Sequence, residues 1–393
     1  MLIEIHAIQN HSPANLNRDD LGAPKTCFFG GVLRSRVSSQ CLKRSIRTSE
    51  QFQRLLGGVR TRQLARLIAE QVKGKSDMTK RAEKILGICG FAAKDEDAPE
   101  GSEKSKMLVY TTREAIGEMA RLLQDGKAKT DAALALDFAK LIRERVAVPD
   151  MALSGRMLEP DKSAKEVWKG LDTTVDAALQ VAHAISTHEA RPEVDYYVAA
   201  DDIPGEDAGA GYVDEAMFAS ACFYKYFSIH WETLVDNLKG YGEKHEKLAA
   251  HTVGAFIRGA ALANPTGKQN SCAAHNPPDG MLIEIKSTPI SYANAFADPV
   301  PTKGERDLIS QSIAQMAQYV HDLDTGYGRP QKRFWFSPNL RYPLSIAGDG
   351  RKQVNLAEHN VKSLEELVPA VVGAIGHDWE KVQKVIVNPE VQA

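Results

Sequence analysis

The chain has 393 residues, of which 43% are hydrophobic and 25% are charged, so it is long enough to bury a large core. Its formal net charge of −2 excludes a generally basic protein, and any nucleic-acid-binding surface must come from local clustering of cations. Five widely separated cysteines argue against a zinc site and a disulfide framework, and no apolar run is long enough to span a membrane.

The N-terminal segment is predicted to be a strand, because residues 2–8 alternate between apolar and polar side chains. No signal peptide opens the chain, so we expect a soluble protein of the cytoplasm. The pentapeptide Met-Leu-Ile-Glu-Ile at residues 1–5 returns word for word at residues 281–285. Since nothing around it repeats, we interpret the two copies as similar central strands.

A basic strand follows the turn signal Phe-Phe-Gly-Gly at residues 28–31. Residues 32–37 alternate as a short strand that carries Arg34 and Arg36 on the same side. From residue 21 to residue 49 the chain contains no acidic residue. The segment therefore concentrates positive charge in a chain that is nearly neutral overall.

The next segment predicts a helix that Ser38 or Ser39 caps. Leu42 and Ile46 point to one side of this helix, and a polar stripe lies on the other side. The stripe consists of Gln40, Lys43, Arg44 and Arg47. Together with the strand arginines it would form a continuous cationic surface at the positive end of a helix, which favours phosphates. The alternative is that the stripe is only the solvated face of an amphipathic helix.

The rest of the chain predicts helices interspersed with a few strands. Helical stretches are expected near 52–72, 78–88, 111–124, 130–145, 172–188, 307–323 and 364–375, and strands at 223–231, 281–285 and 333–337. Residues 151–157 form a return segment that turns at Gly155, and residues 193–217 form a long acidic loop. This pattern predicts an α+β fold with helices on one face of a largely antiparallel sheet, and it permits a split β-α-β arrangement of the RNA-recognition kind.

Motifs for catalysis or metal binding are weak. Residues 264–269 resemble the end of a phosphate-binding loop but lack its earlier glycine and its Ser/Thr, so Lys268 either meets a phosphate or belongs to an ordinary exposed turn. His183 and His188 lack an H-E-x-x-H pattern, and we interpret them as core or helix-end histidines. Asp19 and Asp20 form a carboxylate pair, but neighbouring loop residues rarely supply a two-metal site. We therefore predict no catalytic residue, metal or cofactor.

Five motifs in order resemble signatures of the CasC family, the repeated backbone subunit of the type I-E CRISPR surveillance complex, Cascade. They cover most of the chain up to about residue 328. They are Asn17-Arg18-Asp19-Asp20, Phe-Gly-Gly followed by Arg-Val-Ser-Ser-Gln-Cys-Leu-Lys-Arg, Ala152-Leu153-Ser154-Gly155-Arg156-Met157, Ala182-His183-Ala184-Ile185-Ser186-Thr187-His188 and Ser291-Tyr292-Ala293-Asn294-Ala295-Phe296.

The resemblance implies a hand-shaped protein. Its palm would be an RNA-recognition-motif-like (ferredoxin-like) sheet built from residues 1–50 and 225–393, with inserted helical fingers at 51–190 and a thumb loop at 191–224. Copies of the protein would stack along the guide RNA as a helical filament with other Cascade subunits. The guide would then pair with target DNA, while the protein contacts backbone and shape.

The resemblance also implies the residues that contact RNA. The phosphate-facing set would be Arg18, Lys25, Ser38, Gln40, Lys43, Arg44 and Arg47. Met157 would wedge beside a displaced base, with Tyr196 or Tyr197 as its aromatic counterpart from the thumb. The family is not itself a nuclease. The alternative function is a metal-dependent ribonuclease that acts from the Asp19/Asp20 loop, as backbone relatives in other CRISPR types do.

Overall fold

The structure is a computed structural model that describes residues 1–393 except 73–76, 92–106, 200–211, 304–306, 348–352 and 388–393. The chain divides into two compact units. The first comprises Met1–Phe52, Gln180–His230 and Val253–Lys381, and the second comprises Gln53–Leu179, Trp231–Thr252 and Val382–Ala393.

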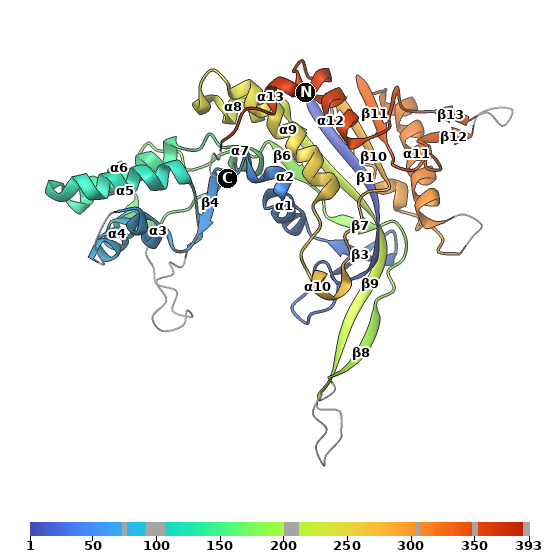
Figure 1. Cartoon of the computed structure of the whole chain (residues 1–393), viewed down its shortest axis with the longest axis horizontal. Helices are drawn as coiled ribbons and strands as arrows, with labels where there is room; N and C mark the ends of the chain where they lie inside the picture. The colour runs from blue at the N-terminus through green and yellow to red at the C-terminus, as the bar shows by residue number, and fades with distance from the viewer. Residues whose placement is uncertain (73–76, 92–106, 200–211, 304–306, 348–352, 388–393) are drawn as a thin grey trace, which may run out of the picture. The chain divides into compact units, whose positions relative to one another are not determined.

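A large mixed sheet organises the first unit, with strand order β14-β11-β10-β1-β9-β7-β3-β2, and β6 and β8 also pair with β9 (Figure 1). The bounds are β1 Leu2–Ala14, β2 Thr26–Phe29, β3 Val32–Val37, β6 Leu179–Val181, β7 Ala184–Ser186, β8 Glu193–Ala199, β9 Tyr212–His230, β10 Gly280–Lys286, β11 Lys332–Phe336 and β14 His359–Val361. The pairings of β1 with β9 and β10 are antiparallel, whereas β11 and β14 are parallel. The mixed α+β class predicted from the sequence is confirmed.

The repeated pentapeptide forms the centre of this sheet. Strands β1 and β10 lie side by side and antiparallel, so that Ile3 faces Ile285 and Glu4 faces Glu284. The prediction of two similar central strands is confirmed. Because the repeat is read in opposite directions on the two strands, it brings two identical glutamates opposite each other inside the protein.

Helices cover both faces of the central strands, and the expectation that they cover only one face is wrong. Helix α11 (Leu308–Tyr327) packs its Ile313 in one apolar cluster with Tyr224 and Leu282. On the other face, Phe227 of β9 meets Phe256 of α9 (His245–Leu262) with ring centroids 5.5 Å apart. The residues of β10 are buried without interruption, and a strand buried on both sides needs cover on both sides.

The first unit also contains shorter elements. Helix α1 (Ser39–Arg47) places its Ile46 against Gly259 of α9, where an added Cβ would lie 2.9 Å from the Ile46 side chain. The other elements are α2 Glu50–Gln53, α10 Gln269–Cys272, η4 Ala293–Phe296, α12 Leu364–Ala374, α13 Trp379–Val382 and the small sheet of β12 Ser345–Ala347 with β13 Gln353–Asn355. The predicted helices near 307–323 and 364–375 are thus confirmed.

The second unit is mainly helical, as expected for residues 51–145. A small antiparallel sheet joins β4 (Gly58–Thr61) to β5 (Val109–Thr112). Its helical elements are α3 Leu64–Gln71, α4 Asp77–Ile88, α5 Arg113–Asp125, η1 Gly126–Ala128, α6 Asp131–Glu144, α7 Pro149–Ser154, η2 Lys162–Ala164, α8 Trp231–Asn237 and η3 Lys239–Tyr241. Among the residues that the structure describes, no helix has both the length and the apolar character needed to cross a bilayer.

Two of the helices predicted from the sequence, at 172–188 and at 52–72, do not form as predicted. Residues 172–188 form β6, β7 and loops, because their backbone pairs with β9: the amide of Ala182 donates to the carbonyl of Tyr226 at 3.0 Å. Local helix preference yields here to tertiary strand pairing. In the stretch 52–72, helix α2 ends at Gln53, and the chain enters β4 at Gly58. A Cβ on Gly58 would lie 2.6 Å from a carboxylate oxygen of Asp150.

The predicted acidic loop at 193–217 is largely a hairpin. Strand β8 pairs antiparallel with the first part of β9, with Glu193 opposite Phe218 and Ala199 opposite Tyr212. Figure 1 shows this hairpin extending away from the rest of the sheet. Residues 200–211, which hold the glycine-rich tip of the predicted loop, lie outside the described residues. The alternating aromatic pattern predicted at 223–231 continues β9 into the core.

Candidate nucleic-acid interface

Helix α1 begins and ends as its sequence predicts. The hydroxyl of Ser38 accepts a hydrogen bond from the amide of Cys41, which satisfies one free donor of the first turn. Leu42 and Ile46 are buried, 2% and 4% exposed. The polar stripe faces away from this core: Gln40 and Arg44 are exposed, and Lys43 and Arg47 are half-buried. The cap and the two faces are therefore confirmed, while RNA binding by these residues stays a prediction.

The start of α1 offers fewer backbone donors than the sequence suggests. The amide of Ser38 donates to Oδ1 of Asn17 at 2.8 Å, and the amide of Ser39 donates to Nδ1 of His183 at 3.0 Å. Partial burial and the neighbouring cations Arg36 and Lys25 lower the pKa of His183, so its ring is neutral and can accept this bond. A phosphate near this helix would therefore meet mainly side chains.

Arg34 does not belong to the exposed cationic surface, and this part of the expectation is wrong. Its side chain is fully buried. The guanidinium donates to the carbonyl oxygens of Phe29, Ser186 and Phe296 at 3.1, 3.1 and 2.7 Å. A planar group with five donors can bind several carbonyls at once, so Arg34 joins the β2–β3 turn to two other segments. Arg36, two residues on, is half-buried.

The loop before β2 brings two more predicted cations to this region. Arg18 is exposed and forms a backbone bridge with Pro24. The amide of Lys25 donates to the carbonyl of Asn17, the residue whose side chain holds the start of α1. Arg18 and Lys25 thus lie on a loop that is tied directly to the cap of the helix.

The carboxylate of Asp19 stabilises its own loop. It accepts hydrogen bonds from the amides of Leu21 and Ala23 at 3.0 and 2.9 Å, as an Asx turn does. Asp20 is exposed. Among the described residues, the group of potential metal ligands found close together lies elsewhere in the chain, so this loop gains no support as a two-metal site.

Lys268 lies next to the same loop. It has a left-handed backbone with φ of 47° at the start of α10. Its neighbour Gly267 approaches so closely that an added Cβ would lie 2.6 Å from the carbonyl oxygens of both Asn15 and Leu16. The structure thus brings Lys268, whose role the sequence left open, next to the loop that carries Arg18.

The two predicted thumb tyrosines stand on β8. Tyr196 is 70% exposed and Tyr197 is 44% exposed. The hydroxyl of Tyr197 donates to Oδ2 of Asp214 at 2.9 Å. Neighbouring residues of a strand point to opposite faces, so the two rings face different sides of the hairpin.

Met157 belongs to the second unit and is 78% exposed. Gly155 has φ of 69°, and the next residue, Arg156, exchanges two backbone hydrogen bonds with Val175 at 2.8 and 2.7 Å. The buried guanidinium of Arg156 donates to the carbonyls of Thr173 and Ile142 at 3.2 and 2.7 Å. These contacts fix the backbone that presents the apolar side chain of Met157 to solvent, while its role beside a base stays a prediction.

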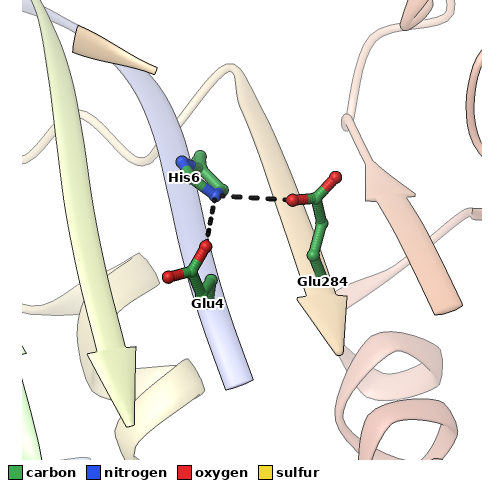
Figure 2. Close-up of side chains that lie close together, drawn as sticks. All are labelled: Glu4, His6 and Glu284. Atoms are coloured by element: carbon green, nitrogen blue, oxygen red, sulfur yellow. Dashed lines mark ion pairs between the residues drawn. The ribbon is translucent and has the colours of Figure 1, made fainter. Parts of the chain in front are cut away.

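A buried cluster of charges that the sequence analysis did not identify lies in the central sheet. Figure 2 shows Glu4 and His6 of β1 pointing toward Glu284 of β10, and Nε2 of His6 lies 3.7 and 3.8 Å from the two carboxylates. All three side chains are fully buried. The repeated Glu of the pentapeptide was the signal that could have identified the carboxylate pair.

This cluster already contains its cation. The ammonium of Lys286 lies 2.8 Å from Glu4 and 2.6 Å from Glu284, and Arg333 lies 2.7 Å from Glu284. Burial would raise the pKa of Glu284, but His6, Lys286 and Arg333 lower it to about 2. Although the three ligand groups have suitable spacing for a metal ion, Lys286 supplies the positive charge there. We interpret the cluster as a buried ion-pair network that stabilises the sheet.

The comparisons with known proteins give one matching protein family and similar solved structures. Residues 3–369 match the model of the CT1975-like protein family (Cas_CT1975). Among solved structures, a chain of a "CRISPR RNA-guided surveillance complex, pre-nicking" is 27% identical, with a TM-score of 0.76 and coverage of 95% of this chain and 100% of that chain. A chain of a "CRISPR RNA-guided surveillance complex" is 24% identical, with a TM-score of 0.58 and the same coverage, and it supports the fold alone. No curated protein matches the chain.

Proposed function

We propose, from the premise that this chain belongs to the CT1975-like protein family, that it is the guide-RNA-binding backbone subunit of a CRISPR surveillance complex. The observation that carries the proposal is the likeness along 95% of the chain to a subunit of such a complex. In support, α1 and the loop before β2 gather exposed and half-buried cations on one unit of the protein. Phosphate contacts of this kind position a nucleic acid without reading its sequence.

The finer proposal follows the resemblance to the CasC family. We infer a type I-E Cascade, in which copies of this protein oligomerise along the guide in the cytoplasm and present it to target DNA. The first unit would supply most of the palm, the β8–β9 hairpin would be the thumb, and much of the second unit would be the fingers. The phosphate-facing set would be Arg18, Lys25, Ser38, Gln40, Lys43, Arg44, Arg47 and Lys268. Met157, Tyr196 and Tyr197 would contact bases.

Ser38 has a particular role in this arrangement. Ser38 is 7% exposed, and its hydroxyl oxygen accepts a hydrogen bond from the amide of Cys41. Because a hydroxyl both accepts and donates, its proton can still be donated to a phosphate. We therefore assign it to both the cap and the interface. The exposed Arg44 and Gln40 on the same helix would make contacts that do not depend on the cap.

Replacing both Arg18 and Arg44 with alanine is expected to weaken RNA binding while leaving folding unchanged. Both side chains are exposed, and surface substitutions of this kind usually alter stability by less than about 0.5 kcal/mol. Each lost phosphate contact should reduce the slope of log affinity against log salt by about 0.7 on single-stranded RNA. The measurement is a salt series of RNA titrations for the wild type and the double variant.

The matched control for this experiment is the double variant Lys162→Ala with Lys169→Ala, two exposed cations of the second unit outside the proposed set. It carries the same loss of charge and should keep the slope of the wild type. An equal loss of slope in both double variants would show that only net charge matters. An unchanged slope in the Arg18 and Arg44 variant would make the cationic stripe a merely solvated surface.

The isolated protein is expected to leave labelled RNA intact in the presence of Mg²⁺ or Mn²⁺. The reason is that the Asp19 carboxylate is already engaged by its own loop, which leaves Asp20 without a second fixed carboxylate partner in that turn. The measurement is gel analysis of end-labelled RNA after incubation. Hydrolysis that disappears in Asp20→Ala would replace the scaffold function with the ribonuclease alternative.

A further inference from the structure

Lys225 is a second buried lysine of the central sheet, and it differs from Lys286 in its surroundings. It lies on β9 directly opposite Ala7 of β1 and is 2% exposed. Because side chains alternate along a strand, it points to the face opposite that of Tyr224 and Tyr226. Phe227 lies on this same face and meets Phe256 of α9, the helix whose Gly259 lies beside Ile46 of α1.

The ammonium of Lys225 has no counter-ion within the described part of the chain. Lys286 lies within 2.8 Å of two carboxylates, whereas no described carboxylate or hydrogen-bond acceptor pairs with Lys225. The titratable groups within its electrostatic reach are the thiol of Cys41 on α1 and the imidazole of His11 on β1. Burial raises the pKa of Cys41, and burial together with Lys225 lowers the pKa of His11 to about 3. Neither group is an anion at neutral pH.

A buried cation without a partner is costly to the folded protein. Burial lowers the pKa of Lys225 to about 8, so at neutral pH most of the molecules carry this charge at that cost. A methionine of similar length would fill the same space without the cost of a buried charge. This position therefore holds a positive charge that no described residue compensates.

The same charge lies close to the proposed RNA surface. The half-buried thiol of Cys41 sits on α1 between Gln40 and Leu42, and three cations act on it: Lys225 from the sheet, Lys25 from the loop before β2, and Arg44 from the helix itself. Three cations thus lie within electrostatic reach of the Cys41 thiol. An anion that binds there would be attracted by all three groups.

We propose that Lys225 is a further phosphate-binding residue, and that a phosphate of the guide RNA bound beside Cys41 supplies the counter-ion that the described part of the chain does not provide. This inference rests on the proposed RNA-binding function and adds to it a cation from the interior of the sheet. In the free protein the uncompensated charge lowers the stability of the fold, and a phosphate of the bound RNA would compensate that charge. Lys225 therefore couples the stability of the first unit to occupancy of the interface.

The test is Lys225→Met in the full chain, with single-stranded RNA as the probe. The variant is expected to lower the affinity for RNA and to raise the thermal stability of the RNA-free protein. RNA binding weakens about tenfold, as the loss of one charge-assisted hydrogen bond implies, and the salt slope falls by about 0.7. In contrast, the thermal midpoint of the RNA-free protein rises. Unchanged affinity and slope would overturn the proposal, and so would a variant that is less stable than the wild type.

A second measurement does not depend on the variant. At pH 8 about half of the Lys225 side chains of the free protein are deprotonated, since their pKa is about 8, and a bound phosphate would favour the charged form. Calorimetric titration in two buffers of different ionisation enthalpy should therefore show proton uptake by the wild type on RNA binding. Lys225→Arg, which cannot be deprotonated, should keep the affinity and lose the uptake. Equal uptake in the wild type and Lys225→Arg would contradict the proposal.

These outcomes are distinct from a failure of the proposed function. If the wild type does not bind RNA at all, the function is wrong. If the wild type binds RNA with the expected salt slope and Lys225→Met binds equally well, the function stands and only the role of Lys225 is wrong.

Discussion

Replacing Lys286 with methionine is expected to lower the free energy of unfolding by about 3–5 kcal/mol, because removing one partner leaves buried charges uncompensated. Its ammonium lies 2.8 Å from Glu4 and 2.6 Å from Glu284, and both carboxylates are fully buried. Arg333 remains beside Glu284, so Glu4 loses the larger share of its compensation. Urea unfolding followed by circular dichroism at neutral pH measures the change.

The pH dependence of this variant provides a second check. Glu284 has a folded pKa of about 2, below the ordinary value of 4.5. A depressed carboxyl pKa contributes stability above pH 4.5 that is lost as the pH falls through about 2. Lys286→Met raises this pKa, so the difference in stability between wild type and variant should narrow on acidification over that range. A difference that stays constant from pH 6 to pH 3 would show that Lys286 stabilises the protein by packing alone.

Lys225→Met is the matched control, since it removes a buried lysine of the same sheet that pairs with no carboxylate in the described ranges of the chain. The two variants are identical in chemistry and should change stability in opposite directions. If both variants destabilise the protein equally, loss of packed volume and not charge pairing determines the effect.

Replacing Gly30 with alanine is expected to destabilise the protein by about 3 kcal/mol or more. Gly30 has φ of 62°, and an added Cβ would lie 1.7 Å from the carbonyl oxygen of Ala297. A backbone atom cannot rotate away as a side chain can, so the turn between β2 and β3 must move. That movement would also loosen Arg34, whose guanidinium spans Phe29 and Phe296. Loss of such a contact belongs to the mechanisms that give large effects of single substitutions.

Gly31→Ala separates the cost of the left-handed backbone from the cost of the close contact between Gly30 and Ala297. Gly31 has φ of 80° and open space where a Cβ would lie, so its substitution carries only the backbone cost, about 1–2 kcal/mol. Both variants are compared by urea unfolding under identical conditions. Equal effects of the two substitutions would mean that the approach of Gly30 to Ala297 is not a tight contact in solution.

Local elements of this protein could be predicted where the residues that determine them lie close together in the sequence. Ser38 caps α1, and Leu42 and Ile46 face inward, because a cap and a helical period need only neighbouring residues. The segment 172–188 was not predictable in this way. Its small apolar residues suit a buried helix, but the amide of Ala182 donates to Tyr226 of a strand distant in sequence.

By itself the sequence determined the position of the cationic stripe, the two central strands and the family resemblance, since each depends on residue identity and spacing along the chain. Only the tertiary structure decided which cations are available to a ligand. Arg34 and Arg36 alternate onto one side of the same strand, yet Arg34 is fully buried among carbonyls and Arg36 is only half-buried. Likewise Lys286 pairs with two carboxylates, whereas Lys225 pairs with none among the residues that the structure describes. The burial and pairing of a charge depend on segments that are far apart in the sequence. They therefore cannot be predicted from the composition of one segment.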